Sequence, residues 1–142
     1  MSVVSHLING ELVESQRTLD VTNPSTGKVI RHVADASAAD VERAIAAAQA
    51  AFPAWRDTPP AKRAQVMYRF KQLLEEHADR LVQLVSEEHG KTVEDAMGEL
   101  KRGIENVEYA CGVPELLKGE YSHNVGPGID AWSNFQPLGV VA

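Results

Sequence analysis

The hydrophobic positions of residues 93–114 repeat with the spacing of a helix. Apolar side chains recur at alternating steps of four and three residues, which places them on one stripe of a helical surface. The stripe comprises Val93, Met97, Leu100, Ile104, Val107, Cys111 and Pro114. Thr92 can cap the start of this helix, with Asp95 in its first turn, and Pro114 is expected to bend or end it. The pattern therefore predicts a long helix with one buried face.

A first helix is predicted upstream, from Ser37 to Pro53. Ser37 followed by Asp40 is typical of a capped helix start, and Pro53 is expected to end the helix because proline lacks an amide hydrogen. The apolar positions of this segment continue past Pro53 and are expected to be buried: Val41, Ile45, Ala48, Phe52 and Trp55.

Two more helices are predicted between residues 59 and 90. Pro59 and Pro60 suit the first positions of a helix, where the missing amide of proline does no harm. The residues expected to point inward are Val66, Met67, Phe70, Leu73 and Leu74, and those expected to point outward are Lys62, Arg63, Lys71 and Glu75. A break at residues 77–79 precedes the next helix, whose expected inward residues are Leu81, Leu84 and Val85. Gly90 can end that helix in the left-handed conformation.

Short strands are predicted on both sides of the helices. Asn9-Gly10 between two apolar pairs indicates a hairpin over residues 6–14, and a turn at residues 23–27 leads into a strand at 28–34. We expect these strands to form an antiparallel patch. Beyond the helices, residues 124–128 are typical of a turn and residues 129–135 of an edge strand. Residues 138–142 form a continuous apolar run, which is typical of a strand buried in a parallel sheet. Such a strand needs neighbouring strands and a crossover helix that these 142 residues do not supply, so we expect the chain to be a fragment.

Composition and charge exclude several function classes. The chain of 142 residues is 44% hydrophobic and 24% charged, with a net charge of −6, and it has no basic patch interleaved with aromatic residues. Nucleic acid is therefore not an expected partner. One cysteine cannot form an internal disulfide, and the five histidines are scattered without metal-ligand spacing. Without a signal peptide or a long apolar run, we expect a cytoplasmic protein with no membrane partner.

Four motifs together resemble the aldehyde dehydrogenase superfamily. They are Asn23-Pro24-Ser25-Thr26-Gly27-Lys28-Val29-Ile30, Ala51-Phe52-Pro53-Ala54-Trp55, Glu88-His89-Gly90-Lys91 with Ala96 and Glu99 following, and Pro137-Leu138-Gly139-Val140-Val141. Each motif is weak alone, but their order and spacing extend over nearly the whole chain. The resemblance implies an α/β fold, namely the N-terminal part of an aldehyde dehydrogenase. That part has an antiparallel hairpin with short strands, a cluster of about four helices, an oligomerisation-type strand and the first strand of a Rossmann-like parallel sheet.

The same resemblance divides the chain into three expected parts. Residues 1–121 would form the N-terminal hairpin and the helical part of the dinucleotide-binding domain. Residues 122–136 would form the oligomerisation-type strand, and residues 137–142 the truncated start of the Rossmann-like sheet. The family assembles through strands that begin near residues 122–136, so we expect a homo-oligomer, either a dimer or a tetramer.

One branch of the superfamily is favoured by residues 98–110 and 116–120. The run Arg102-Gly103-Ile104-Glu105-Asn106-Val107-Glu108-Tyr109-Ala110 is similar to that of the methylmalonate-semialdehyde (malonate-semialdehyde) dehydrogenases, which acylate coenzyme A. In that branch a cysteine thiolate attacks the aldehyde, hydride passes to NAD, and the thioester is transferred to coenzyme A with loss of carbon dioxide. The resemblance thus implies a semialdehyde substrate, propionyl-CoA or acetyl-CoA as product, and a role in valine catabolism.

The family's nucleophile and its NAD-binding segments are expected downstream of Ala142. We therefore assign no catalytic, cofactor-binding or metal-binding residue in this chain and expect it to be inactive alone. Two alternatives remain open. The complete protein could be another aldehyde dehydrogenase, for succinate semialdehyde or a non-acidic aldehyde, or the chain could be a non-catalytic helical interaction module.

Arg102 is the one candidate substrate-binding residue. The resemblance implies that it recognises the carboxylate of the semialdehyde, a role that suits a planar guanidinium with a permanent charge. The alternative is an exposed arginine paired with Glu99 or Glu105, which are within reach on the same helix.

Three other residues invite a functional interpretation that we reject. Cys111 lies on the predicted buried stripe, without a helix N-terminus or a base beside it, so it is expected to be a core residue rather than a nucleophile. His89 precedes a helix end, where a structural role is expected. Lys91 in Gly90-Lys91-Thr92 lacks the upstream glycine and strand of a phosphate-binding loop.

Overall fold

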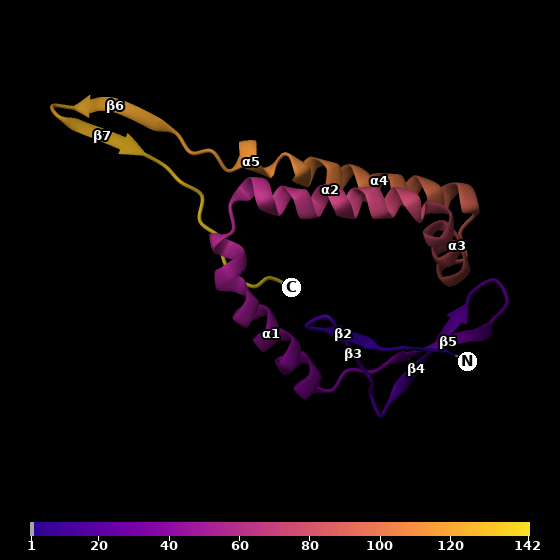
Figure 1. Cartoon of the computed structure of the whole chain (residues 1–142). Coiled ribbons are helices and arrows are strands. Elements are labelled where there is room, and N and C mark those ends of the chain that lie inside the picture. Colours follow the sequence, from indigo (N-terminus) through magenta and orange to yellow (C-terminus); the bar gives the residue numbers. More distant parts are fainter. Residues whose placement is uncertain (1) are drawn as a thin grey trace.

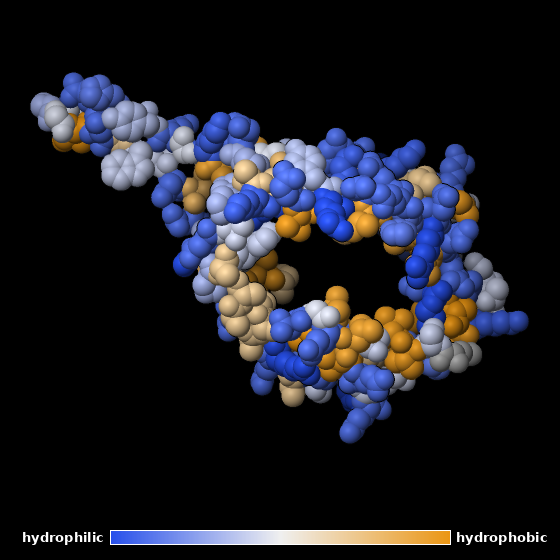
Figure 2. Space-filling view, viewed as in Figure 1, coloured by the Kyte–Doolittle hydropathy of each residue, from blue (hydrophilic) through white to orange (hydrophobic). Residues whose placement is uncertain are grey.

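The computed structural model describes residues 2–142 and arranges them around an opening (Figure 1). The N-terminal strands form one side of this ring, the helices between residues 38 and 111 form the others, and a two-stranded hairpin near the C-terminus projects away from it. Figure 2 shows the opening passing between the space-filling side chains, with hydrophobic residues along parts of its rim.

The N-terminal strands form two small sheets. In the first sheet, β1 (Val3–Val4) pairs in parallel with β5 (Lys28–Ala34), and β5 pairs antiparallel with β4 (Thr18–Asn23). The second is the predicted hairpin of β2 (His6–Ile8) and β3 (Glu11–Val13). Its turn residues Asn9 and Gly10 have φ of 53° and 79°, the positive values that a tight hairpin requires.

Two details of these sheets differ from the sequence expectation. The patch is mixed rather than antiparallel, because β1 joins β5 in parallel. The edge strand β4 was not predicted, because its only large aliphatic side chains are Leu19 and Val21, and Leu19 is exposed. Pairing with β5, rather than local hydrophobic alternation, accounts for this strand.

Helix α1 (Ala38–Asp57) begins as predicted. The Asp40 amide donates to Ser37 Oγ at 3.2 Å and the Ser37 amide donates to Asp40 Oδ2 at 2.9 Å, which completes a capping box. The prediction that Pro53 ends the helix is wrong. The helix continues to Asp57, and Thr58 closes it by donating its hydroxyl to the Ala54 carbonyl at 2.8 Å. The amide hydrogen bond that Pro53 cannot donate therefore did not prevent the helix from continuing to Asp57.

The predicted apolar stripe of α1 is not buried in this structure. No residue of α1 is buried, and Val41, Ile45 and Trp55 are exposed. Of the elements in the described chain, the hairpin strand β2 approaches α1, next to its run of alanines. A stripe of this width needs a larger apolar surface to cover it.

Helices α2 (Pro60–Glu76), α3 (Ala78–His89) and α4 (Val93–Cys111) pack together, with α2 alongside α4 (Figure 1). Pro60 occupies the first turn of α2, and the break at His77 separates α2 from α3, as predicted. One side chain is buried in each of α2 and α3, Ala64 and Val82, and two are buried in α4, Ala96 and Cys111. Small side chains at these positions let the helices approach closely.

The orientation of α2 differs from the expectation. Met67 and Leu74 are half-buried as predicted, but Val66, Phe70 and Leu73 are 52%, 46% and 42% exposed. Arg63 and Lys71, expected to point outward, are half-buried instead. Helix α2 thus packs against α4 and the single turn α5 (Val113–Leu116) with Ala64 buried, while the face that carries Val66, Phe70 and Leu73 is left open.

Helix α4 begins and ends close to where the sequence predicts. Gly90 ends α3 in the left-handed conformation with φ of 81°, and Thr92 caps α4 by accepting from the Asp95 amide at 3.2 Å. The helix ends at Cys111, before the single turn α5 (Val113–Leu116), which carries Pro114. The predicted stripe of α4 is buried or half-buried at every position except Val93, which is exposed.

The C-terminal region corrects two further expectations. Strands β6 (Tyr121–Gly126) and β7 (Ile129–Trp132) form an antiparallel hairpin, so residues 124–126 lie in a strand and Pro127-Gly128 makes the turn. The strand predicted at 138–142 does not form, and Leu138 is 98% exposed. A strand of a parallel sheet needs a neighbour to receive its hydrogen bonds, and the described residues supply none beside it.

The chain exposes much more surface than a compact domain of its size. A folded monomer of 15.5 kDa exposes about 7,200 Å² by the usual scaling with mass. This chain exposes 10902 Å². Many large apolar side chains on α1, α2 and the C-terminal hairpin account for part of that excess. Among the described helices, none has the length and hydropathy needed to cross a membrane.

Candidate functional site

Arg102 lies on α4 in a shallow recess of about 480 Å³. The recess is lined by Lys91 from the connection before the helix and by Glu94, Asp95, Gly98, Glu99 and Arg102 from α4 itself. The space beside Gly98 is open, because a Cβ added there would meet no atom within 4 Å. The site is thus a charged surface along the first half of α4.

Lys91 and Glu99 form an ion pair across the start of α4. Lys91 Nζ donates to Glu99 Oε2, and the lysine side chain is only 23% exposed. The hydrogen bond from Lys91, followed by its charge, lowers the pKa of Glu99 below the ordinary glutamate value. Ser86 Oγ donates to the Lys91 carbonyl at 2.8 Å, which fixes the lysine backbone against the end of α3. Glu99 is therefore held as a carboxylate with its own cation.

The Arg102 guanidinium has no ion-pair partner within residues 2–142. Asn106, which the sequence places on the same face, donates its side-chain amide to the Arg102 carbonyl at 3.0 Å. The expected alternative, a surface pair with Glu99 or Glu105, is not formed here. An exposed guanidinium without an internal carboxylate can bind an external one through two parallel hydrogen bonds.

Cys111 is buried at the end of α4, on the stripe that packs against the other helices. Its Sγ lies 3.4 Å from the Val107 carbonyl, to which the thiol donates. This position agrees with a core residue and not with an accessible nucleophile. His89 lies in the last turn of α3, where a structural role was expected. Within residues 2–142 no group of three or more metal-ligating side chains comes together.

Sequence reasoning missed the ion pair of Lys91. Local rules consider side chains three or four positions apart on one helix, whereas Lys91 precedes the helix and meets a residue eight positions later. It also missed Arg31, whose guanidinium contacts Glu87 at 2.6 Å and Glu88 at 2.8 Å. The separation of β5 and α3 along the chain left no local signal for that contact.

Comparison with known proteins agrees with this architecture. The sequence profile described as the aldehyde dehydrogenase family matches residues 12–142. A malonate-semialdehyde dehydrogenase of Pseudomonas aeruginosa is 68% identical over 143 residues, covering 100% of this chain and 29% of its own length. The acylating, mitochondrial methylmalonate-semialdehyde dehydrogenase of Arabidopsis thaliana is 43% identical over 98% of this chain and 23% of its own length.

Solved structures give the same result for the fold. A methylmalonate-semialdehyde dehydrogenase from Oceanimonas doudoroffii superposes with a TM-score of 0.93 at 63% identity, over 97% of this chain and 28% of that one. A Sinorhizobium meliloti structure, described as a methylmalonate-semialdehyde dehydrogenase complexed with NAD, has a TM-score of 0.91 at 42% identity, over 96% of this chain and 28% of that one. The chain thus spans less than a third of the length of these relatives. The α/β architecture is that of the N-terminal part of their fold, as predicted, and the chain belongs to the aldehyde dehydrogenase family.

Proposed function

We propose that the complete protein oxidises malonate or methylmalonate semialdehyde with NAD and, with loss of the substrate carboxylate as carbon dioxide, transfers the remaining acyl group to coenzyme A, giving acetyl-CoA or propionyl-CoA. The observation that carries the proposal is the 68% identity to a malonate-semialdehyde dehydrogenase along the whole of this chain. The Arabidopsis relative, whose name includes the word acylating, supports transfer to coenzyme A. A place in valine catabolism in the cytoplasm belongs to the same proposal.

The cofactor NAD is supported by the Sinorhizobium relative that was crystallised with it. NAD accepts hydride in the proposed reaction. The described residues have no glycine-rich phosphate loop between a strand and a helix, so we assign none of them to the cofactor. We place the cofactor site, like the cysteine nucleophile, outside these residues.

In this proposal Arg102 binds the carboxylate of the semialdehyde. Its guanidinium is exposed in the recess of α4, and Glu99, the carboxylate three positions before it on the helix, is already paired with Lys91. A charge-assisted, two-point contact would orient the substrate and favour an aldehyde that carries an acid group. An uncharged aldehyde would gain nothing from this contact.

We also propose that the complete protein is a homo-oligomer, a dimer or a tetramer, that assembles through the region 122–136. The hairpin β6–β7 supports this proposal because it projects from the rest of the chain (Figure 1) and exposes large side chains. These side chains are Tyr121, Val125, Ile129 and Trp132. A two-stranded hairpin with such a surface is marginally stable without a partner. The division into residues 1–121, 122–136 and 137–142 is part of this proposal.

The test is an assay of the longest product of the reading frame that contains these residues. NADH formation is followed from malonate semialdehyde and from methylmalonate semialdehyde, each with and without coenzyme A. We expect turnover that depends on coenzyme A, with the acyl-CoA product identified by mass spectrometry. Turnover that is indifferent to coenzyme A would instead indicate a hydrolytic aldehyde dehydrogenase, and succinate semialdehyde and propanal serve as comparison substrates.

A further inference from the structure

We infer that Lys91 is a positioning residue for the substrate carboxylate: by pairing with Glu99 it keeps that carboxylate away from Arg102. The inference rests on the proposed function of Arg102 and adds two residues to it. Lys91 would not touch the substrate. It would act by keeping the guanidinium of Arg102 available.

The spacing of residues on α4 lets Arg102 compete with Lys91 for the carboxylate of Glu99. Glu99 and Arg102 are three positions apart on one helix, a spacing that brings their side chains together, and the acidic residue comes first, which is the favourable order. Glu99 is nevertheless bonded to Lys91, a residue outside the helix. One carboxylate thus has two cations within reach, and the structure shows it with the lysine.

The lysine is well held for this role. Its side chain is mostly covered, and its backbone carbonyl accepts from Ser86 Oγ. Gly90, immediately before it, closes α3 in the left-handed conformation and directs the chain into α4. A cation with a fixed backbone loses less freedom on pairing than one on a mobile loop.

The other carboxylates around the recess are weaker competitors for Arg102 than Glu99. Glu94 and Asp95 also line the recess, but both lie in the first turn of α4, where the positive end of the helix stabilises a carboxylate. Glu105 is a weaker competitor than Glu99, because it follows Arg102 and so has the less favourable order along the helix.

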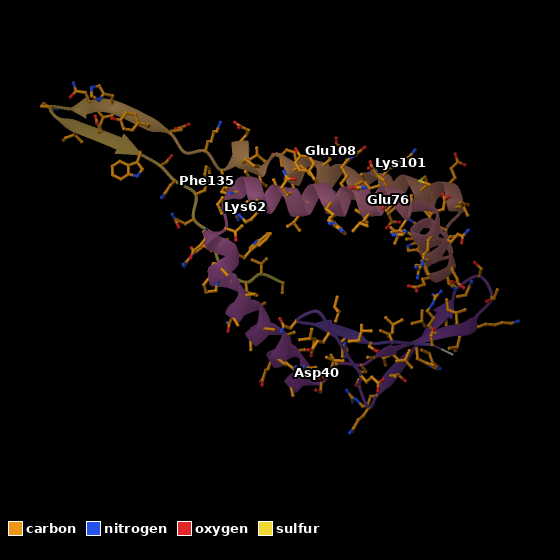
Figure 3. The ribbon with its side chains drawn as sticks, viewed as in Figure 1. Asp40, Lys62, Glu76, Lys101, Glu108 and Phe135 are labelled. Carbon is orange, nitrogen blue, oxygen red and sulfur yellow. The ribbon has the colours of Figure 1, made fainter. Side chains whose placement is uncertain are left out.

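The test compares four variants of the complete enzyme: Lys91→Met, Glu99→Gln, the double variant Lys91→Met with Glu99→Gln, and Lys101→Met. Lys101, labelled on α4 in Figure 3, directly precedes Arg102 in the sequence and has no ion pair within residues 2–142, so it controls for the loss of one positive charge. The Michaelis constants for malonate semialdehyde and for NAD and the turnover number are measured for each variant.

We expect Lys91→Met to raise KM for the semialdehyde about fivefold, the effect of releasing one exposed carboxylate to compete for Arg102. KM for NAD and kcat stay close to those of the unaltered enzyme. The decisive result is the double variant, because Glu99→Gln removes the competitor and returns KM to within about twofold of the original value. Lys101→Met leaves KM for the semialdehyde within the same range.

Two results would overturn the inference. If the double variant keeps the raised KM, Lys91 acts in another way, for example by binding the substrate itself. If Lys91→Met lowers kcat and raises both Michaelis constants alike, its role is structural. An Arg102→Ala variant measured in parallel separates this inference from the proposed function. A raised KM in Arg102→Ala with an unchanged KM in Lys91→Met rejects the inference alone, whereas an unchanged KM in Arg102→Ala rejects the role of Arg102.

Discussion

Pro24 lies directly against Gly90, so the turn between β4 and β5 packs against the turn between α3 and α4. A Cβ added to Gly90 would be 2.7 Å from Pro24 Cγ, closer than such atoms approach in proteins. Pro24 and Gly90 belong to two separate motifs and lie 66 positions apart in the sequence, yet they are in contact. The contact joins the N-terminal sheet to the helices, and Gly90 is the residue that permits it.

Gly90→Ala is expected to destabilise the complete protein by more than Gly10→Ala. Both glycines have a similar positive φ, 81° and 79°, and alanine in this conformation costs about 1–2 kcal/mol. Only at Gly90 does the new methyl group meet another residue, and overpacking adds about 1–3 kcal/mol. Denaturant unfolding of both variants measures the difference. Equal losses of stability would mean that the Pro24 contact yields without cost.

Arg31→Met is expected to loosen α3 from the N-terminal sheet. Arg31 donates to Glu87 and Glu88 at once, and the hydrogen bond to Glu87 is the main reason that the pKa of Arg31 is raised. Its removal also leaves two adjacent carboxylates without a cation. The thermal midpoint should fall by a few degrees and amide exchange in α3 should accelerate.

The matched control for Arg31 is Arg17→Met. Arg17 forms one ion pair, with Asp35 at 2.8 Å, and its side chain is 71% exposed compared with 21% for Arg31. Exposed single pairs contribute little to stability. A fall in thermal midpoint as large for Arg17→Met as for Arg31→Met would contradict the special role of the Arg31 contact.

The hairpin β6–β7 is expected to weaken in acid through Asp130. Its carboxylate accepts from the Tyr121 hydroxyl at 2.5 Å and from the Asn124 amide at 2.8 Å, and lies 2.9 Å from His123 Nδ1. The Tyr121 hydrogen bond is the largest cause that lowers the pKa of Asp130. A lowered pKa contributes stability above the unfolded value of about 3.9, and that stability is lost as the pH falls through the folded value.

The measurement for Asp130 is a carbon-13 NMR titration of its carboxyl group. Tyr121→Phe should move the pKa of Asp130 upward, towards the ordinary aspartate value, because the strongest hydrogen bond is gone. Tyr109→Phe is the control, since Tyr109 is an exposed tyrosine on α4. An unchanged pKa of Asp130 in Tyr121→Phe would show that the hydroxyl does not stabilise the carboxylate in solution.

Arg102→Ala is expected to raise KM for malonate semialdehyde by about tenfold or more, because a charge-assisted hydrogen bond to the substrate is lost. KM for NAD should not change. Arg102→Lys should recover only part of the effect, since lysine keeps the charge but not the two-point contact. Small, equal changes in both Michaelis constants would leave Arg102 as an ordinary surface residue.

The 142-residue chain produced alone is expected not to form a compact monomer. Its exposed area of 10902 Å² and its open apolar face on α2 leave too little burial to offset the entropy of ordering the chain. Size-exclusion chromatography should show aggregates, and an apolar dye should bind strongly. A monodisperse monomer with one cooperative unfolding transition would instead favour the alternative of a self-contained interaction module.

Local features of the fold were predictable because they depend on residues close together in the sequence. The hairpin turn at Asn9-Gly10, the capping box of Ser37 and Asp40, and the end of α3 at Gly90 each follow from a few adjacent residues. The stripe on α4 followed from periodicity alone. The end of α1 was predicted wrongly at Pro53, because the prediction considered the missing amide of proline but not the hydroxyl of Thr58, which closes the helix further along.

The candidate site was predictable in part. Arg102 was proposed from its motif and its role stays a prediction, whereas Lys91 was set aside as a member of a false phosphate loop, and its ion pair to Glu99 could not be foreseen. That pair depends on the angle at which the chain leaves α3 and enters α4. Sequence spacing describes neighbours on one helix, and it does not describe side chains that meet across a turn.

By itself the sequence determined the family, the order of the helices with most of their ends, and the chemistry available at Arg102. These follow from motifs, periodicity and capping residues, whose effects act over a few positions. The tertiary structure alone decided which face of α2 is covered, that β1 joins β5 in parallel, and that Lys91 rather than Arg102 holds Glu99. The physical reason is that packing and ion pairing depend on distance in space, and many alternative partners satisfy the same local pattern.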